Sequence, residues 1–124
     1  MNIEEIRKKC LSVMGAEEFI DKVIVNYKIM EKVFAFFPIA FKNNEHFIVI
    51  KCDPVKSAEL RKKYEGVTKG YYTGNTLMWN SVYINKDVPD KLIEELILHS
   101  ANEVVKSLPK YQQEEYISQE KTKK

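Results

Sequence analysis

The residues best suited to chemistry lie together in the middle of the chain, in a segment rich in tyrosine and basic residues. Tyr71 and Tyr72 follow Lys69 in a glycine-flanked loop, and Trp79, the only tryptophan, comes shortly afterwards. Aromatic rings that stack on bases, next to cations that attract phosphates, are typical of surfaces that bind single-stranded nucleic acid. A structural role is the alternative, in which the tyrosines pack a turn and the tryptophan is buried against a sheet.

Further basic residues join this cluster if the helix that carries them packs beside the strand before it. Lys51 closes an apolar run, and Arg61 and Lys62 follow within the next helical segment. The alternative is a solvated helix face, because Glu59 and Glu65 dilute the positive charge. The predicted nucleic-acid-binding residues are Lys51, Arg61, Lys62, Lys69, Tyr71, Tyr72, Asn75, Trp79 and Asn80.

Metal binding and catalysis have no comparable support in the sequence. His46 and His99 are isolated from other metal-ligating residues. Because a zinc centre needs three or four ligands, we expect no metal site and a structural hydrogen-bonding role for His99. Cys10 and Cys52 lack the spacing of a zinc or redox motif and are expected to be reduced, partly buried thiols. No nucleophile, phosphate-loop or zinc-protease motif is visible, so we expect no enzyme activity and no cofactor.

The composition describes one globular domain with little bias in charge. The chain has 124 residues and a net charge of +2, and arginine accounts for only Arg7 and Arg61 among its 20 basic residues. Because arginine is preferred for base recognition, the composition argues against a strong sequence-specific DNA-binding protein. No apolar run approaches the ~18–20 residues of a membrane helix. The acidic N-terminus is unlike a signal peptide, so we expect a cytoplasmic protein without a membrane partner.

The first half of the chain combines one helical pattern with several strand patterns. Asn2 and Glu5 have the spacing of a capping box and precede apolar residues at helical intervals, which predicts a helix that stops at Gly15. Glu17, Glu18 and Asp21 form a small acidic group that we expect to lie in a solvated loop. Strands are predicted over residues 23–29, 33–37 and 47–52, with a turn at 30–32 and a polar connection at 41–45.

The second half is predicted to contain two helices and two strands. Asp53 is suited to cap a helix that ends before Gly66, and Asp90 opens the longest helix, which continues to Leu108. Strands are predicted over residues 67–73 and 79–84. In the polar segment 110–124 we expect a short helix at most, followed by disorder at residues 121–124.

These elements predict an α+β fold, an α/β sandwich with an antiparallel sheet of four to six strands and helices packed on one face. Short connections between the strands favour antiparallel pairing. The uncovered face of the sheet is either wet or a binding surface. We expect one domain over residues 1–109 and a polar tail over residues 110–124, in a monomeric protein.

Several segments of the chain together resemble one known family. These segments are Cys10-Leu11-Ser12, Lys32-Val33-Phe34-Ala35, Lys51-Cys52-Asp53-Pro54, Gly70-Tyr71, Trp79-Asn80-Ser81-Val82-Tyr83, and Val88-Pro89-Asp90-Lys91-Leu92-Ile93 through His99-Ser100. Their order and spacing over residues 1–109 resemble the MmcQ/YjbR family, whose fold is called CyaY-like. The resemblance implies a DNA-binding surface. The loop departs from the family pattern, since Tyr72 stands in place of a histidine and residues 75–78 replace a basic end.

The leading functional hypothesis is a small cytoplasmic binding module with weak, largely sequence-independent affinity for DNA or single-stranded nucleic acid. The alternative is a protein-interaction or small-ligand-binding module without affinity for nucleic acid. An enzyme would need a catalytic site that the sequence does not show.

Overall fold

A computed structural model describes residues 1–42 and 45–122, and this part of the chain forms four helices and one six-stranded sheet. The helices are α1 (Ile3–Leu11), α2 (Pro54–Lys63), α3 (Asp90–Lys106) and α4 (Lys110–Thr122). The strands are β1 (Glu17–Asp21), β2 (Ile24–Ile29), β3 (Lys32–Pro38), β4 (Phe47–Lys51), β5 (Val67–Lys69) and β6 (Trp79–Tyr83). They are arranged in the order β1-β2-β3-β4-β6-β5, with every neighbouring pair antiparallel. The predicted α+β fold is therefore confirmed.

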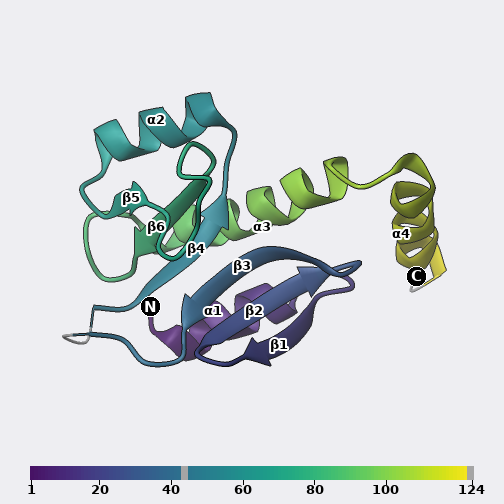
Figure 1. Cartoon of the computed structure of the whole chain (residues 1–124), viewed down its shortest axis with the longest axis horizontal. Helices are drawn as coiled ribbons and strands as arrows, with labels where there is room; N and C mark the ends of the chain where they lie inside the picture. The colour runs from purple at the N-terminus through teal and green to yellow at the C-terminus, as the bar shows by residue number, and fades with distance from the viewer. Residues whose placement is uncertain (43–44, 123–124) are drawn as a thin grey trace.

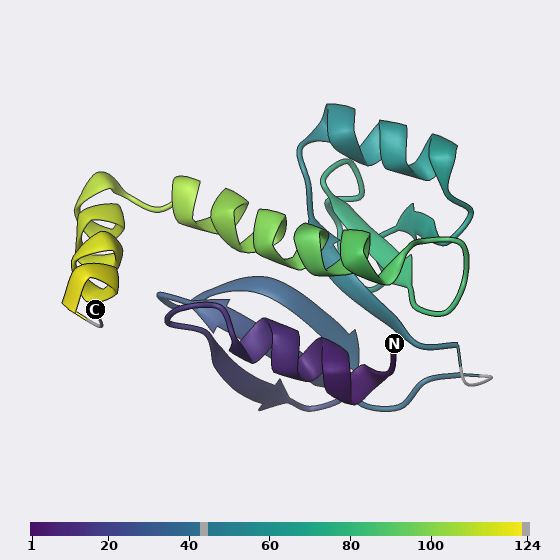
Figure 2. The same cartoon turned by 180° about the vertical axis from the view of Figure 1, so that it is seen from behind.

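The main helices cover one face of the sheet and leave the other open. Figure 2 shows α1 and α3 in front of the strands, whereas Figure 1 shows the opposite face of the same strands. Helix α2 lies beside β5 and β6, and α4 stands at the far end of α3. No helix among the described residues combines the length and the apolar character that a membrane span requires.

Local sequence explains where these helices begin. In α1, the Asn2 side chain accepts from the Glu5 N–H at 2.9 Å, and the Glu5 carboxylate accepts from the Asn2 N–H at 3.2 Å. In α2, the Asp53 carboxylate accepts from the Lys56 N–H at 2.8 Å and Pro54 occupies the first turn. Both caps satisfy backbone N–H groups that have no partner within the helix, so both predicted helix starts are confirmed.

The longest helix supplies much of the core. One stripe of α3 is buried against the sheet, and its apolar members are Ile93, Leu96, Ile97, Ala101 and Val104. They pack with buried residues of α1 and of the central strands in one continuous cluster. Burial of this stripe confirms the predicted helix and fixes which face of the sheet is closed.

The acidic segment predicted as a solvated loop is instead the edge strand β1. Glu17–Asp21 pairs with β2 along its whole length. Successive side chains of β1 therefore lie on opposite faces of the sheet, as in any strand. Glu18 lies on the helix-covered face, where its carboxylate accepts hydrogen bonds from Arg7 and Tyr27. These long-range partners stabilise a strand whose own sequence resembles a loop.

The tail also contains more structure than its polar composition indicates. Helix α4 extends through Thr122, so the expectation of a short helix and of disorder at residues 121–122 is wrong. Residues 123–124 of the tail lie outside the described residues, and so do residues 43–44 of the predicted polar connection. The Gln113 amide donates to the Leu108 carbonyl at 2.8 Å, and the Tyr116 hydroxyl donates to the Met14 carbonyl at 2.7 Å. Contacts with α3 and with the turn after α1 therefore position α4.

The α3 stripe gives a direct test of the core. Replacing Ile97 with Asp should lower the free energy of unfolding by about 3–5 kcal/mol, because the carboxylate would be buried without a partner. Leu98→Asp is the matched control, since the neighbouring Leu98 is 39% exposed and should tolerate the charge. Urea denaturation measures both variants. Equal stability of the two variants would show that α3 is not packed as described.

Candidate functional site

The open face of the sheet carries a second apolar cluster that is mainly aromatic. Its buried members are Ile24, Phe36, Phe47 and Val49, and its partly buried members include Val33, Trp79 and Tyr83. Ring centroids are 5.8 Å apart for Phe36 and Trp79 and 5.1 Å apart for Phe47 and Tyr83. The cluster lies away from α1 and α3, because strand residues alternate between the two faces. This face is therefore a platform of rings and is not simply wet.

The loop from β5 to β6 folds onto this platform and carries the two predicted tyrosines. The Tyr71 N–H donates to the Ser81 hydroxyl at 2.9 Å, and the Tyr71 ring lies 5.5 Å from that of Phe47. The ring of Tyr72 stacks on that of Tyr71, with ring centroids 5.9 Å apart. The Tyr72 side chain is 76% exposed, and its backbone φ is 57°. This left-handed conformation is uncommon for a bulky residue, and such backbone occurs preferentially at functional sites.

At the start of this loop, the backbone of Gly70 lies close to the backbone of Trp79. A Cβ at Gly70 would lie 2.9 Å from the carbonyl oxygen of Trp79, so only glycine fits there. The Gly70 N–H donates to the same carbonyl at 2.9 Å. Glycine therefore allows the loop to turn directly onto the platform.

Shallow hollows flank the tyrosine pair. One hollow of about 300 Å³ lies beside Tyr72 and Trp79, and its remaining lining is Asp21, Ile24, Asn26, Val33, Phe36 and Thr73. The second, of about 310 Å³, lies beside Tyr71 and is lined also by Pro38, Ala40, Phe41, Lys42, Glu45, Phe47 and Tyr83. Flat aromatic walls in open hollows are accessible to another planar ring.

Besides Lys42 of the second hollow, three lysines lie around the platform, and sequence analysis identified one of these four. Lys51 is the cross-strand neighbour of Trp79 and shares its face. Lys28 places its Nζ 4.4 Å from the centre of the Phe19 ring, and Lys86 places its Nζ 5.2 Å from that of Tyr83. Cation–π contacts of this kind could be found only after strand register was known. Acidic groups interrupt the positive charge, since Asp21 and Glu45 line the hollows.

Two of the predicted binding residues lie beneath the loop and position it. Asn80 is fully buried; its amide donates to the Ser57 hydroxyl at 2.9 Å and to the Met78 carbonyl at 3.1 Å. Its oxygen accepts from Arg61 Nε at 2.8 Å, while Arg61 Nη2 donates to the carbonyls of Thr76 and Trp79. The guanidinium therefore links α2 to the loop through internal contacts.

The other predicted residues divide between the two sides of the sheet. Lys69 is the cross-strand partner of Asn80, so it points to the side of α2 rather than to the platform. Lys62 is exposed on α2, and Asn75 is exposed in the loop. The structure thus brings together Lys51, Tyr71, Tyr72 and Trp79, and it separates them from Lys62 and Lys69.

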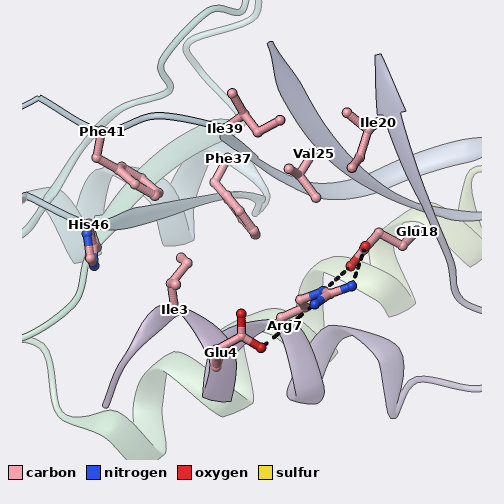
Figure 3. A pocket seen from close by; sticks show the side chains of 10 residues that line it. All are labelled: Ile3, Glu4, Arg7, Glu18, Ile20, Val25, Phe37, Ile39, Phe41 and His46. Atoms are coloured by element: carbon pink, nitrogen blue, oxygen red, sulfur yellow. Dashed lines mark hydrogen bonds and ion pairs between the residues drawn. The ribbon is translucent and has the colours of Figure 1, made fainter. Parts of the chain in front are cut away.

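A larger pocket lies on the helix-covered side, between α1 and the strands β1 to β3 (Figure 3). Its volume is about 510 Å³. Its apolar lining residues are Ile3, Ile20, Val25, Phe37, Ile39 and Phe41. Glu4, Arg7 and Glu18 line one end, and His46 lies toward the other (Figure 3). Sequence analysis missed this pocket because it depends on β1, which was expected to be a loop.

The charged groups in this pocket are already paired with one another. Arg7 donates to Glu18 through Nε at 2.6 Å and Nη2 at 2.8 Å, and the Tyr27 hydroxyl donates to the same carboxylate at 2.9 Å. Hydrogen bonds from Arg7 and then Tyr27 hold the pKa of Glu18 below its usual value, against the effect of burial. Burial and the bond to Glu18 raise the pKa of Tyr27. The pocket therefore offers an apolar wall and the paired charges of Arg7 and Glu18, with Glu4 and His46 as its other ionisable groups.

Both cysteines are buried free thiols in the structure. Burial is the main cause that raises the pKa of Cys10 and of Cys52 to about 12. A thiol with so high a pKa is a poor nucleophile at neutral pH. This agrees with the packing role expected from the sequence.

Comparison with known proteins gives a family match and two similar structures. A protein-family model described as YjbR matches residues 11–100. The Deinococcus radiodurans protein DR2400, assigned a DUF419 domain, is similar in structure with a TM-score of 0.81 and 24% identity, covering 93% of this chain and 87% of that protein. A Pseudomonas syringae protein has a TM-score of 0.67 and 20% identity, covering 81% of this chain and 96% of its own. At these identities the structures show a shared fold alone. No curated protein matches the chain.

The Arg7–Glu18 pair predicts a specific dependence of stability on pH. Because the folded pKa of Glu18 is depressed, its contribution is present above the ordinary value of 4.5 and is lost as the pH falls through the folded pKa. Glu18→Gln should lower the melting temperature by about 3 °C near neutral pH, and the difference from the wild type should shrink in acid.

Glu17→Gln is the matched control, because Glu17 is exposed on the same strand. Thermal unfolding followed by circular dichroism at several pH values measures all three proteins. A Glu18→Gln difference that stayed constant down to strongly acidic pH would contradict the ion-pair assignment.

Proposed function

The chain belongs to the YjbR family, and from the aromatic platform on its open sheet face we propose that it binds single-stranded nucleic acid weakly and without base preference. The single observation that carries the proposal is the group of Tyr71, Tyr72 and Trp79 on one face, with Lys51 beside them. The role is binding rather than catalysis, in a cytoplasmic and monomeric protein.

Stacking is the attractive interaction that this surface offers. Tyr72 and Tyr71 are 76% and 44% exposed, and Phe19 at the β1 edge is 50% exposed. Stacking of one base on an aromatic side chain contributes about 1–3 kcal/mol and tolerates any base, because every base has a π-face. The hollows on either side of the tyrosines leave room for bases along the platform.

Electrostatics supports weak and unspecific binding. The cations placed around the rings and hollows are Lys28, Lys42, Lys51 and Lys86, and Asp21 and Glu45 oppose them. We infer about two to four phosphate contacts, which supply affinity but no sequence information. Arginine, the usual residue for base recognition, is committed to internal contacts at Arg7 and Arg61.

Small-ligand binding is the second candidate, and the pocket beneath α1 favours it. The cavity of about 510 Å³ is within the size range of small-molecule sites, and it combines an apolar wall with charged and polar groups. Since Arg7 and Glu18 neutralise each other and Glu4 adds a further carboxylate, an apolar molecule without negative charge is the suitable ligand. Such a module would need no affinity for nucleic acid.

Fluorescence anisotropy with labelled single-stranded oligonucleotides tests the leading proposal. Binding should be micromolar or weaker at low salt. It should fall by about seven- to fiftyfold as salt rises fourfold, since each of the two to four phosphate contacts contributes a slope of about −0.7 on single strands. Tyr72→Ala should weaken binding by about tenfold through lost stacking. Lys51→Ala should reduce the salt slope by about 0.7 without changing base preference.

Lys8→Ala is the control, because Lys8 is exposed on α1 in the opposite layer. It should leave both affinity and salt slope unchanged. If micromolar wild-type protein gave no anisotropy change at low salt, the nucleic-acid proposal would fail and the ligand pocket would become the leading candidate.

A further inference from the structure

Three metal-ligating side chains come together where the β4–α2 connection passes α3. His99 and Glu103 lie one turn apart on α3, and Asp53 caps α2. One ligand atom from each of them lies within 4.8 Å of the other two. In Figures 1 and 2 the chain crosses α3 as it leaves β4 for α2. This group is far from the platform tyrosines in sequence and shares no residue with the pocket beneath α1.

The histidine in this group has a buried nitrogen without a hydrogen bond. Among the described side chains, His99 Nε2 is the buried polar atom that lacks a hydrogen-bond partner. Its nearest opposite charge is Glu103 Oε1 at 3.7 Å, beyond hydrogen-bond distance. The predicted hydrogen-bonding role of His99 is therefore not fulfilled at this atom. Since leaving a buried nitrogen unpaired costs free energy, this atom needs another partner.

We propose that Asp53, His99 and Glu103 bind a divalent transition-metal ion of the zinc type. Imidazole nitrogen together with carboxylate oxygen suits Zn²⁺ better than Mg²⁺, which prefers oxygen ligands and retained water. An ion coordinated by His99 Nε2 would satisfy the unpaired nitrogen. Three protein ligands leave the fourth position of a tetrahedral ion open to water or an anion.

The surroundings orient the ligands, although the positive charges of Lys56 and Lys106 act on His99 and oppose a bound cation. Asp53 Oδ1 already accepts a hydrogen bond from the Lys56 N–H. This bond fixes the orientation of the carboxylate, as hydrogen bonds to metal-ligating side chains do in known metal sites. Ligand atoms of a tetrahedral zinc ion lie about 3.4 Å apart. The His99 and Glu103 atoms, 3.7 Å apart, therefore need to close by only about 0.3 Å, and no pair of ligand atoms needs to close by more than about 1.4 Å. Lys106 Nζ lies 3.8 Å from Glu103 Oε1, but its side chain is 74% exposed and is free to turn into solvent. Metal binding would then join α2 to α3.

Calorimetric titration of the untagged full chain with Zn²⁺ tests the proposal. We expect one ion per chain with a micromolar dissociation constant, and binding that excess Mg²⁺ does not displace. His99→Gln and Glu103→Gln should each weaken binding by about tenfold or more. Asp53→Asn should do the same while it preserves the cap of α2, because asparagine is an equally good N-cap. Circular dichroism checks that each variant is folded.

Three controls separate this site from other sources of affinity. His46→Gln tests the other histidine, Glu95→Gln tests an exposed acid on α3, and Cys52→Ser tests the buried thiol next to Asp53. All three should bind Zn²⁺ as the wild type does. Absence of binding by the wild type, unchanged binding by folded His99→Gln, or loss of binding in Cys52→Ser would each overturn the assignment.

Discussion

The packing of α3 across the divide between β3 and β4 is the interaction on which the rest of the structure depends. Within the described residues, these strands pair at Ala35↔Ile50 and Phe36↔Val49. Beyond that point the sheet opens into two halves (Figure 1). Ser100 of α3 is fully buried in the divide, where its hydroxyl donates to the Phe34 carbonyl at 2.6 Å and accepts from the Lys51 N–H at 2.7 Å. The Ser100 hydroxyl thus satisfies a backbone carbonyl and a backbone N–H that would pair with each other's strands if the β3–β4 hydrogen-bond ladder were longer.

This packing gives the two faces of the sheet different chemistry. On the closed side, charged groups are paired internally, as Arg7 is with Glu18. Arg61 likewise uses its guanidinium to hold the loop and not to bind a ligand. The open side retains rings and lysines, which are suited to stacking and to unspecific attraction of phosphates. The proposed lack of base preference therefore follows from where the arginines are used.

The same helix brings chemically independent groups to separate surfaces. By covering β4, α3 places His99 and Glu103 beside the cap of α2, while the loop tyrosines lie on the other face. Similarity to structures at low identity establishes the fold but not what either surface binds. Each proposal consequently depends on its own residues, and loss of one property should leave the other intact.

The sequence by itself determined the elements whose signals are local. The capping box of α1, the apolar stripe of α3 and the strands around residues 47–52 and 79–84 were predictable because caps and periodicity act over a few residues. It also singled out the aromatic segment around Tyr71, although the predicted strand over residues 67–73 ends at Lys69 in the structure. Only the tertiary structure decided that Glu18 lies in a strand, that α4 is anchored through Tyr116, and that Asn80 is buried. It alone placed Asp53 beside His99. These outcomes depend on strand register and on partners distant in the chain, which local sequence does not encode.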